Sequence, residues 1–286
     1  MAALAIAATA KPPCAPKLPT AFALESLANE LAYLAGPALV SILGASGYPA
    51  AGTILAAALT LGGGLCFAAQ RRTAPPASGA AGRHGTGRSL LRPGFAVLAG
   101  VNLAIGGFFG AMQISVTAFA AGHGAAGTAA ALFTVSGCAS LLAGWLYGLR
   151  RWRTAPRVQL AVATAGLAAG CLPLLVAGSP FELGFGVALT GLAIPPILVL
   201  CSVLAEAAVH RTVLTQAFVW LNSASAAGSA GAAAAAGWAV ETFGARAGFA
   251  VAAVAACVMA ALAVTGLRAL RVAGPGFEPG YAKPTV

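Results

Sequence analysis

The stretch TAFALESLANELAYLAGPALVSILG, from Thr20 to Gly44, is a long apolar segment that carries two carboxyl side chains, Glu25 and Glu30, well inside it. If a helix begins near Thr20, a rise of about 1.5 Å per residue places Glu30 about 15 Å along it, in the middle of a hydrocarbon layer about 30 Å thick. A carboxylate at that depth costs on the order of 2.5 to 3.5 kcal/mol, so it is expected to face protein or water. The stretch therefore predicts a membrane-spanning helix with a functional carboxyl group.

The composition extends this prediction to the whole chain. Hydrophobic residues make up 59% and charged residues 8% of the 286 positions, whereas about 25% of the residues of a soluble domain are charged. None of the apolar runs alternates as a membrane β-strand does, so the spans must be helices. We expect an all-α, polytopic transmembrane bundle with eight spans. The first covers about residues 20–43, the second runs from the Gly47-Tyr48-Pro49 turn to about 69, and the others cover about 94–121, 125–149, 158–177, 181–205, 213–240 and 247–267.

The segments between the spans divide the chain into five regions. Residues 1–19 read as the end of a preceding helix followed by a Pro-rich linker, and residues 20–69 as two helices. Residues 70–93 form a loop with five arginines, too rich in Gly, Pro, Ser and Ala to bury a core. Residues 94–267 form a six-helix unit, and residues 268–286 a polar tail.

The net charge of +10 is better explained by topology than by nucleic-acid binding. With eight spans and an internal amino terminus, fifteen of the sixteen Lys and Arg residues fall in internal segments, and only Arg246 lies outside. This follows the positive-inside rule. The expected location is the bacterial inner membrane, with several passes and both termini in the cytoplasm.

The reactive side chains argue against an enzyme. The six cysteines are scattered without a CxxC pair, which predicts buried thiols and neither disulfides nor a metal site. The three histidines all fall in loops and the chain has no Asp, so the pairs that an intramembrane enzyme needs are missing. We expect no cofactor.

Three polar side chains reach a similar depth on three different spans. Counted from the inner ends, Glu30 lies about 15 Å in, Asn102 about 12 Å and Asn222 about 13 Å, which is where transporters hold substrate. The alternative for the two amides is a hydrogen bond across a helix contact, worth about 0.6 kcal/mol. Gln113 is a further polar candidate on the span that carries Asn102.

The two carboxyl groups of the first span are expected to differ in role. They lie about 140° apart around a helix, so both cannot face one narrow cavity. Glu30, the deeper one, is the candidate for proton coupling, whereas Glu25 can simply pair with an arginine. Trp220 lies too deep for the interfacial belt and is a candidate for stacking on an aromatic or cationic substrate, with packing as the alternative.

Two sites are expected to bend or break helices. Gly36-Pro37 should kink the first span, and Pro195-Pro196 should interrupt the sixth beside a cavity, because proline removes an amide donor. These four residues are the gating candidates. Between Ala226 and Gly237 the chain is rich in Gly and Ala, which predicts a surface for close helix packing.

Three motifs now point to a family. Glu25-Ser26-Leu27-Ala28-Asn29-Glu30 followed by Gly36-Pro37 resembles the fifth helix of actinobacterial transporters of the major facilitator superfamily. Gly144-Trp145-Leu146-Tyr147-Gly148 before Arg150-Arg151-Trp152-Arg153 is similar to the family's basic loop between helices eight and nine, and Ala226–Gly237 leading to Glu241 is similar to its eleventh helix. On this alignment the chain matches helices five to twelve, and the first four are absent.

The resemblance implies a secondary carrier for export of a small organic or drug-like molecule, driven by protons. The implied partners are that substrate, protons and the lipid bilayer, and no nucleic acid. Self-association or a missing amino-terminal half is a further expectation. The alternative is a truncated, non-transporting remnant or a gene model that starts too late.

Overall fold

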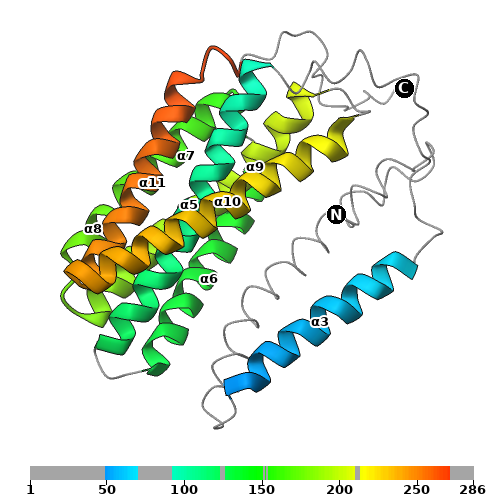
Figure 1. Cartoon of the computed structure of the whole chain (residues 1–286). Helices are drawn as coiled ribbons and strands as arrows, with labels where there is room; N and C mark the ends of the chain where they lie inside the picture. The colour runs from blue at the N-terminus through cyan, green and yellow to red at the C-terminus, as the bar shows by residue number, and fades with distance from the viewer. Residues whose placement is uncertain are drawn as a thin grey trace, which may run out of the picture.

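The computed structural model describes residues 49–69, 92–122, 126–150, 152, 154–209 and 213–270, and within them only helices and turns occur, with no strand. The helices are α3 (Pro49–Ala69), α5 (Pro93–Gly122), α6 (Ala126–Leu149), α7 (Pro156–Gly170), α8 (Leu172–Val176), α9 (Pro180–Ala208), α10 (Leu214–Phe243) and α11 (Ala245–Thr265). Figure 1 shows α5 to α11 side by side as one bundle.

The described residues are all-helical, as predicted, and five segments among them are long and apolar enough to cross a membrane. They are Pro93–Gly122, Thr128–Leu149, Pro156–Val176, Pro180–Ala208 and Ala245–Thr265. The 30-residue α10 is long enough as well, but its Ala, Gly and Ser content lowers its hydropathy. In α3 the apolar part covers Ile54–Cys66. The first predicted span, 20–43, lies outside the described residues, so the structure supports five of the eight spans.

Helix α7 ends earlier than the predicted span 158–177. The helix stops at Gly170, the amide of Cys171 donates to the carbonyls of Leu167 and Ala168, and the short α8 follows. Pro173 explains the break, because it has no N–H to donate to the carbonyl four residues earlier. The predicted span 158–177 took no account of this proline. The ends of the other four candidate spans agree with the prediction to within three residues.

The predicted interruption at Pro195-Pro196 is not observed, since α9 is continuous over 29 residues. Each proline removes one backbone hydrogen bond and its ring crowds the carbonyl four residues earlier, yet α9 accommodates both prolines within one helix. Across the contact with α6, a Cβ on Gly144 would lie 3.4 Å from Cβ of Pro195. The proline ring therefore packs against a position with no side chain.

The bundle consists of two three-helix units that pack mainly on each other. The first unit contains α5, α6 and α7–α8, and the second contains α9, α10 and α11. Helix α5 packs mainly against α10 and α11, while α9 packs mainly against α6 and α7. Consecutive helices run in opposite directions (Figure 1), so the second unit begins in the opposite direction to the first. The units are therefore inverted and interleaved.

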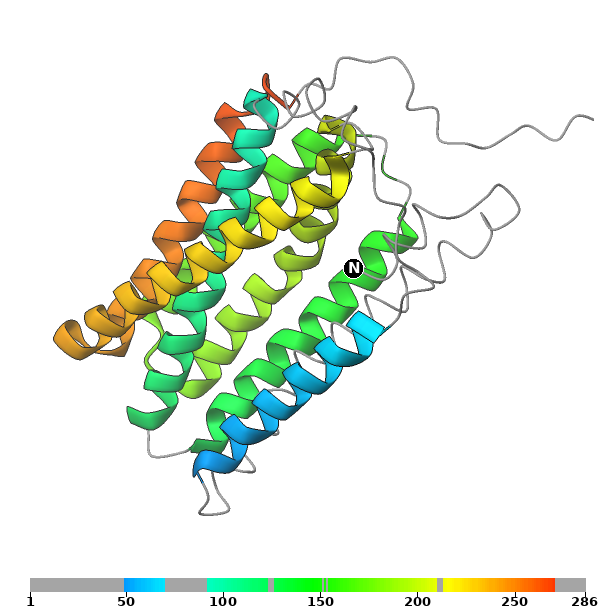
Figure 2. The ribbon, with the colours of Figure 1, turned by 45° about the vertical axis from the view of Figure 1, so that its right-hand side comes forward.

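Helix α5 is the centre of this bundle. In its apolar window 61% of the residues are buried, against 11% for α6. Leu98, Val101, Ile105 and Phe108 of α5 are almost fully enclosed, together with apolar side chains of α7, α9 and α11. Figure 2 shows α3 outside the bundle, where Leu59, Leu61 and Leu65 are largely exposed.

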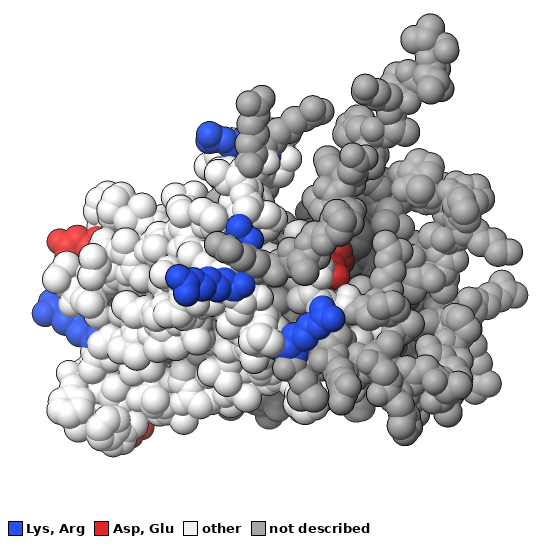
Figure 3. Space-filling model, turned by 90° about the horizontal axis from the view of Figure 1, so that it is seen from above, with Lys and Arg blue, Asp and Glu red and all other residues white. Residues whose placement is uncertain are grey.

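The charges lie at the ends of the helices. Among the described residues, Arg92, Arg150, Arg157 and Arg268 lie at one end, here called the basic end, and Arg246 lies at the other, here called the Arg246 end. Between these ends the surface carries apolar side chains such as Leu142, Leu146 and Val162. This belt between the two ends suits the interior of a bilayer. Figure 3 looks at the molecule from above, where Lys and Arg side chains are scattered among uncharged residues.

Candidate functional site

The crossing of α5 and α10 is the tightest contact near the predicted site residues. A Cβ on Gly106 would overlap the carbonyl oxygen of Ser225, and one on Gly110 would overlap that of Ser229. On the opposing helix, a Cβ on Gly228 would overlap the carbonyl oxygen of Leu103. The two backbones thus touch directly, which only small residues one turn apart allow.

Asn102 and Asn222 lie next to this crossing. Asn102 is one turn before Gly106 on α5, and Asn222 is about one turn before Ser225 on α10, and both helices run in the same direction. Asn102 is half-buried, and its Nδ2 donates to the carbonyl of Leu98 at 2.8 Å. Asn222 is exposed and makes no side-chain hydrogen bond within the described residues. The two amides do not bond to each other.

Trp220 and Asn222 point to opposite sides of α10. They are two residues apart, which is about 200° around an α-helix. Trp220 is 58% exposed, so it does not pack into the core, and Asn222 is exposed on the other side. One narrow cavity cannot be lined by both side chains. Trp220 and Asn222 therefore cannot both contact a substrate in the same cavity.

Gln113 lies beyond the crossing on α5. It is eleven residues after Asn102, which is about 20° around the helix and about 16 Å along it. Its side chain is exposed and has no hydrogen bond among the described residues, while its carbonyl accepts from the Thr117 hydroxyl at 2.8 Å. Asn102 and Gln113 thus share a face of α5, with Gly106 between them.

The remaining candidates of the first span, Glu25, Glu30, Gly36 and Pro37, lie outside the described residues. The carboxyl groups in the described part are those of Glu182, Glu206 and Glu241. All three are exposed and lie near the ends of α9 or α10. The middle of the described helices therefore carries no carboxyl group.

The contact of α6 with α9 resembles the α5–α10 crossing, because a glycine again lies against a backbone carbonyl oxygen. A Cβ on Gly191 of α9 would lie 2.8 Å from the carbonyl oxygen of Ser136 on α6. Pro195, one turn later, faces Gly144, and both Pro195 and Pro196 are half-buried. In each contact a glycine of one unit meets a serine carbonyl of the other unit.

Two cavities lie away from all of these candidates, at the Arg246 end. One is lined by Pro173, Val176, Ala177, Phe181, Glu182 and Phe185, and the other by Phe119, Gly178, Phe243, Gly244, Ala245 and Arg246. None of the site residues predicted from the sequence lines either cavity. The pattern Ser179-x-x-Glu182, a helix-capping signature, and the single external arginine were the available signals.

Five of the six cysteines lie in the described residues, and Cys14 lies outside them. Cys171 and Cys201 are buried, as predicted, whereas Cys66, Cys138 and Cys257 are exposed on the apolar surface. No three His, Cys, Asp or Glu side chains in this part come together as a metal site.

Comparisons with protein-family models, with curated proteins and with solved structures gave no match.

Proposed function

We propose that the protein is a secondary carrier of the major facilitator type that exports a small organic molecule by proton coupling. The observation that carries this proposal is the exchange of helices between the two inverted units, in which α5 packs on α10 and α11, and α9 packs on α6 and α7. Inverted repeats that interleave in this way are a recurring architecture of secondary transporters, which hold substrate at the repeat interface.

The α5–α10 and α6–α9 contacts are suited to relative motion. Both contain backbone surfaces without large side chains, at Gly106 and Gly110 in one case and at Gly144 and Gly191 in the other. Helices with such surfaces can shift along each other without rearranging side chains. In this proposal Asn102 and Asn222 offer hydrogen bonds to the substrate beside the first contact, and the half-buried Pro195-Pro196 pair lies at the second.

Proton coupling needs an ionisable group that changes exposure. Because the described helices carry no carboxyl group in their middle, the proposal assigns this role to Glu30 and leaves Glu25 as its internal control. Glu30→Gln keeps the shape of the side chain and removes its proton. We expect it to abolish gradient-driven flux, and Glu25→Gln to retain it.

The proposal also includes the orientation of the chain in the membrane. The arginines of the basic end would face the cytoplasm and Arg246 the outside, with both termini internal, in a bacterial inner membrane. In a chain without its native cysteines, Thr154→Cys at the basic end and Thr242→Cys at the Arg246 end are both exposed positions. An impermeant maleimide added to intact cells should label only position 242.

The proposed function is tested by measuring the transport of organic compounds across a membrane. The full chain is reconstituted into vesicles with an imposed pH gradient and supplied with a panel of organic cations and neutral aromatic compounds. Gradient-dependent movement of at least one compound, lost in Glu30→Gln and in Asn222→Ala but not in Ser223→Ala, is the expected result. Absence of gradient-dependent flux for the whole panel would favour the alternative of a non-transporting remnant.

A further inference from the structure

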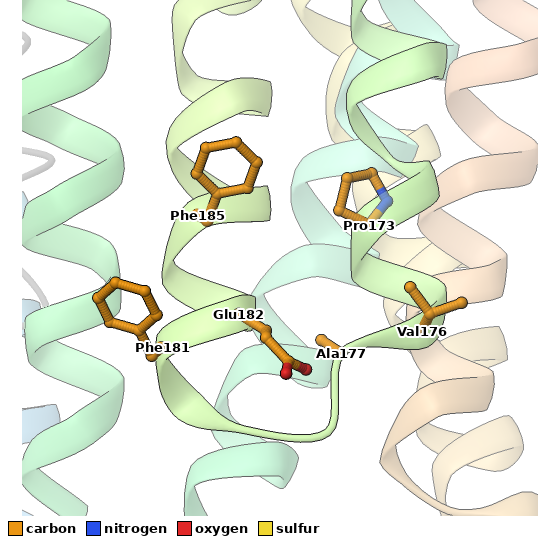
Figure 4. A pocket seen from close by; sticks show the side chains of 6 residues that line it. All are labelled: Pro173, Val176, Ala177, Phe181, Glu182 and Phe185. Carbon is orange, nitrogen blue, oxygen red and sulfur yellow. The ribbon is translucent and has the colours of Figure 1, made fainter.

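A shallow, largely apolar cavity lies between α8 and α9 and is open to the surface of the bundle. It has a volume of about 280 Å³, and five of its six lining residues are apolar (Figure 4). Phe185 and Pro173 lie on either side of it, and Glu182 extends from α9 toward the α8–α9 turn. Phe181 is 88% exposed and Val176 is 75% exposed. In a spanning bundle these apolar side chains face acyl chains.

Two side chains of opposite charge, Arg246 and Glu182, lie next to this cavity without forming an ion pair. A Cβ on Gly178 would lie 3.5 Å from Nη2 of Arg246 and 3.8 Å from Oε2 of Glu182, so the two groups approach the same point. Nevertheless no ion pair joins them, and Arg246 has no other hydrogen-bond or ion-pair partner within the described residues. A cation and a carboxylate therefore flank a small space next to Gly178.

Glu182 retains a free acceptor. Its Oε2 accepts from the amide of Gly178 at 2.8 Å, and its own amide donates to the Ser179 hydroxyl at 3.3 Å, so the carboxylate is held in place by the cap of α9. The other oxygen, Oε1, has no partner within the described residues. A carboxylate accepts several hydrogen bonds, and the Arg246 guanidinium offers five N–H donors.

Arg246 also belongs to the second cavity, of about 340 Å³, which Phe119 and Phe243 help to line. The two cavities share the α8–α9 turn, because Ala177 lines the first and Gly178 lines the second. The two cavities therefore lie on either side of the α8–α9 turn, one with the carboxylate of Glu182 and the other with the guanidinium of Arg246. Both lie at the helix ends, at headgroup level in a bilayer.

We propose that this site binds a phospholipid whose headgroup carries a primary ammonium group, such as phosphatidylethanolamine. The phosphate accepts from Arg246, the ammonium donates to Oε1 of Glu182, and an acyl chain lies against Phe185, Pro173 and Val176. The two charges of this headgroup are joined by only two carbon atoms, so one headgroup can reach both side chains beside Gly178.

The same chemistry disfavours the other common headgroups. A choline nitrogen carries no N–H and cannot donate a hydrogen bond to Glu182. A phosphatidylglycerol headgroup brings a phosphate for Arg246 but places no cation near Glu182, so the carboxylate opposes its negative charge. Selectivity for the ethanolamine headgroup is therefore the specific prediction.

The experiment is native mass spectrometry of the full-length chain, delipidated in detergent and titrated with phosphatidylethanolamine, phosphatidylcholine or phosphatidylglycerol of identical acyl chains. We expect preferential binding of phosphatidylethanolamine. Arg246→Gln and Glu182→Gln should each weaken it about tenfold, since each removes a charged hydrogen bond. Arg268→Gln and Glu206→Gln are matched controls, because they remove the same charges at the opposite ends of α11 and α9, and should leave binding unchanged.

A third variant tests the binding site by filling it, without removing a charge or changing the cap of α9. Gly178 does not have a positive φ, so Gly178→Leu is compatible with the backbone and fills the space between the two charges. It should abolish the ethanolamine preference while the protein stays folded. Equal binding of the three lipids, an equal loss in the control variants, or displacement by soluble phosphorylethanolamine at lipid-like concentrations would overturn the proposal.

Discussion

Gly228 provides the sharpest test of the α5–α10 contact at the scale of single residues. Gly228→Ala would place a methyl group on the carbonyl oxygen of Leu103, and overpacking of this kind costs about 1 to 3 kcal/mol. Three residues later, Gly231 has nothing within 4 Å of its Cβ position. Gly231→Ala is therefore expected to be neutral or to stabilise the helix by up to about 1 kcal/mol.

The measurement is thermal unfolding of both variants in the same detergent. Because the two positions share a helix, a residue type and a substitution, intrinsic helix propensity cancels between them. Equal unfolding temperatures for the two variants would contradict the packing described here.

These two glycines also show what the sequence could reveal about the site. The run Ala226–Gly237 predicted a helix-packing surface, and Gly228 and Ser229 do contact α5. Gly231 and Gly237 do not, because the rotation of α10 about its own axis is set by its neighbours and not by its composition. Depth along a helix could be estimated for Asn222 and Trp220, whereas their opposite directions follow from rotation, which the sequence analysis did not consider.

At the scale of elements, α10 is the helix whose membrane crossing is least evident from hydropathy. Trp220 and Trp238 are eighteen residues apart, which is five full turns, so they lie on one side of the helix and about 27 Å apart. That distance is close to the hydrocarbon thickness of about 30 Å. Both rings are exposed, Trp220 by 58% and Trp238 by 64%. We expect each tryptophan to lie at one membrane interface, which would place Asn222, two residues after Trp220, near the mouth of the substrate path and not at mid-membrane.

Single-tryptophan variants that retain only Trp220 or only Trp238 test this arrangement in vesicles with brominated lipids. Bromine near the headgroup should quench both variants more strongly than bromine near the bilayer centre. Stronger quenching of Trp220 by the deep bromine would place it mid-membrane, as its position in the sequence first indicated.

Helix ends could be predicted better than helix continuity. Gly and Pro clusters mark most of the boundaries, as at Gly244, whose φ of 88° suits a residue without a side chain. The prediction of helix continuity was wrong at two places. Pro173 ends a helix that was predicted to continue, and Pro195-Pro196 lies inside a helix that was predicted to break. The same residue type breaks a helix at one site and is tolerated at another, where Pro195 packs against Gly144, a position without a side chain.

At the scale of the whole molecule, the order in which the helices pack could not be predicted from the sequence, because it depends on contacts between spans far apart in the chain. That order leads to a prediction about folding. Since α5 and α9 each pack mainly on the other unit, neither unit should be stable alone. Cutting the gene at Gly178-Ser179 should give fragments that are degraded when expressed singly and that associate when expressed together.

A cut between residues 80 and 81, before α5, is the matched control for this experiment, because it leaves both units on one fragment. The fragment with α5 to α11 should then accumulate in the membrane by itself. Independent stability of the fragment that ends at Gly178 would show that the units do not depend on each other as described.

The central claim is that the bundle is a carrier, and accessibility of position 222 tests it most directly. In a chain without native cysteines, Asn222→Cys is treated with an impermeant maleimide from either side of oriented vesicles, with and without a pH gradient. A carrier predicts that reaction shifts from one side to the other with the gradient, while Trp220→Cys, on the opposite side of α10, reacts from neither. Labelling of position 222 from one side only, whatever the gradient, would contradict the account.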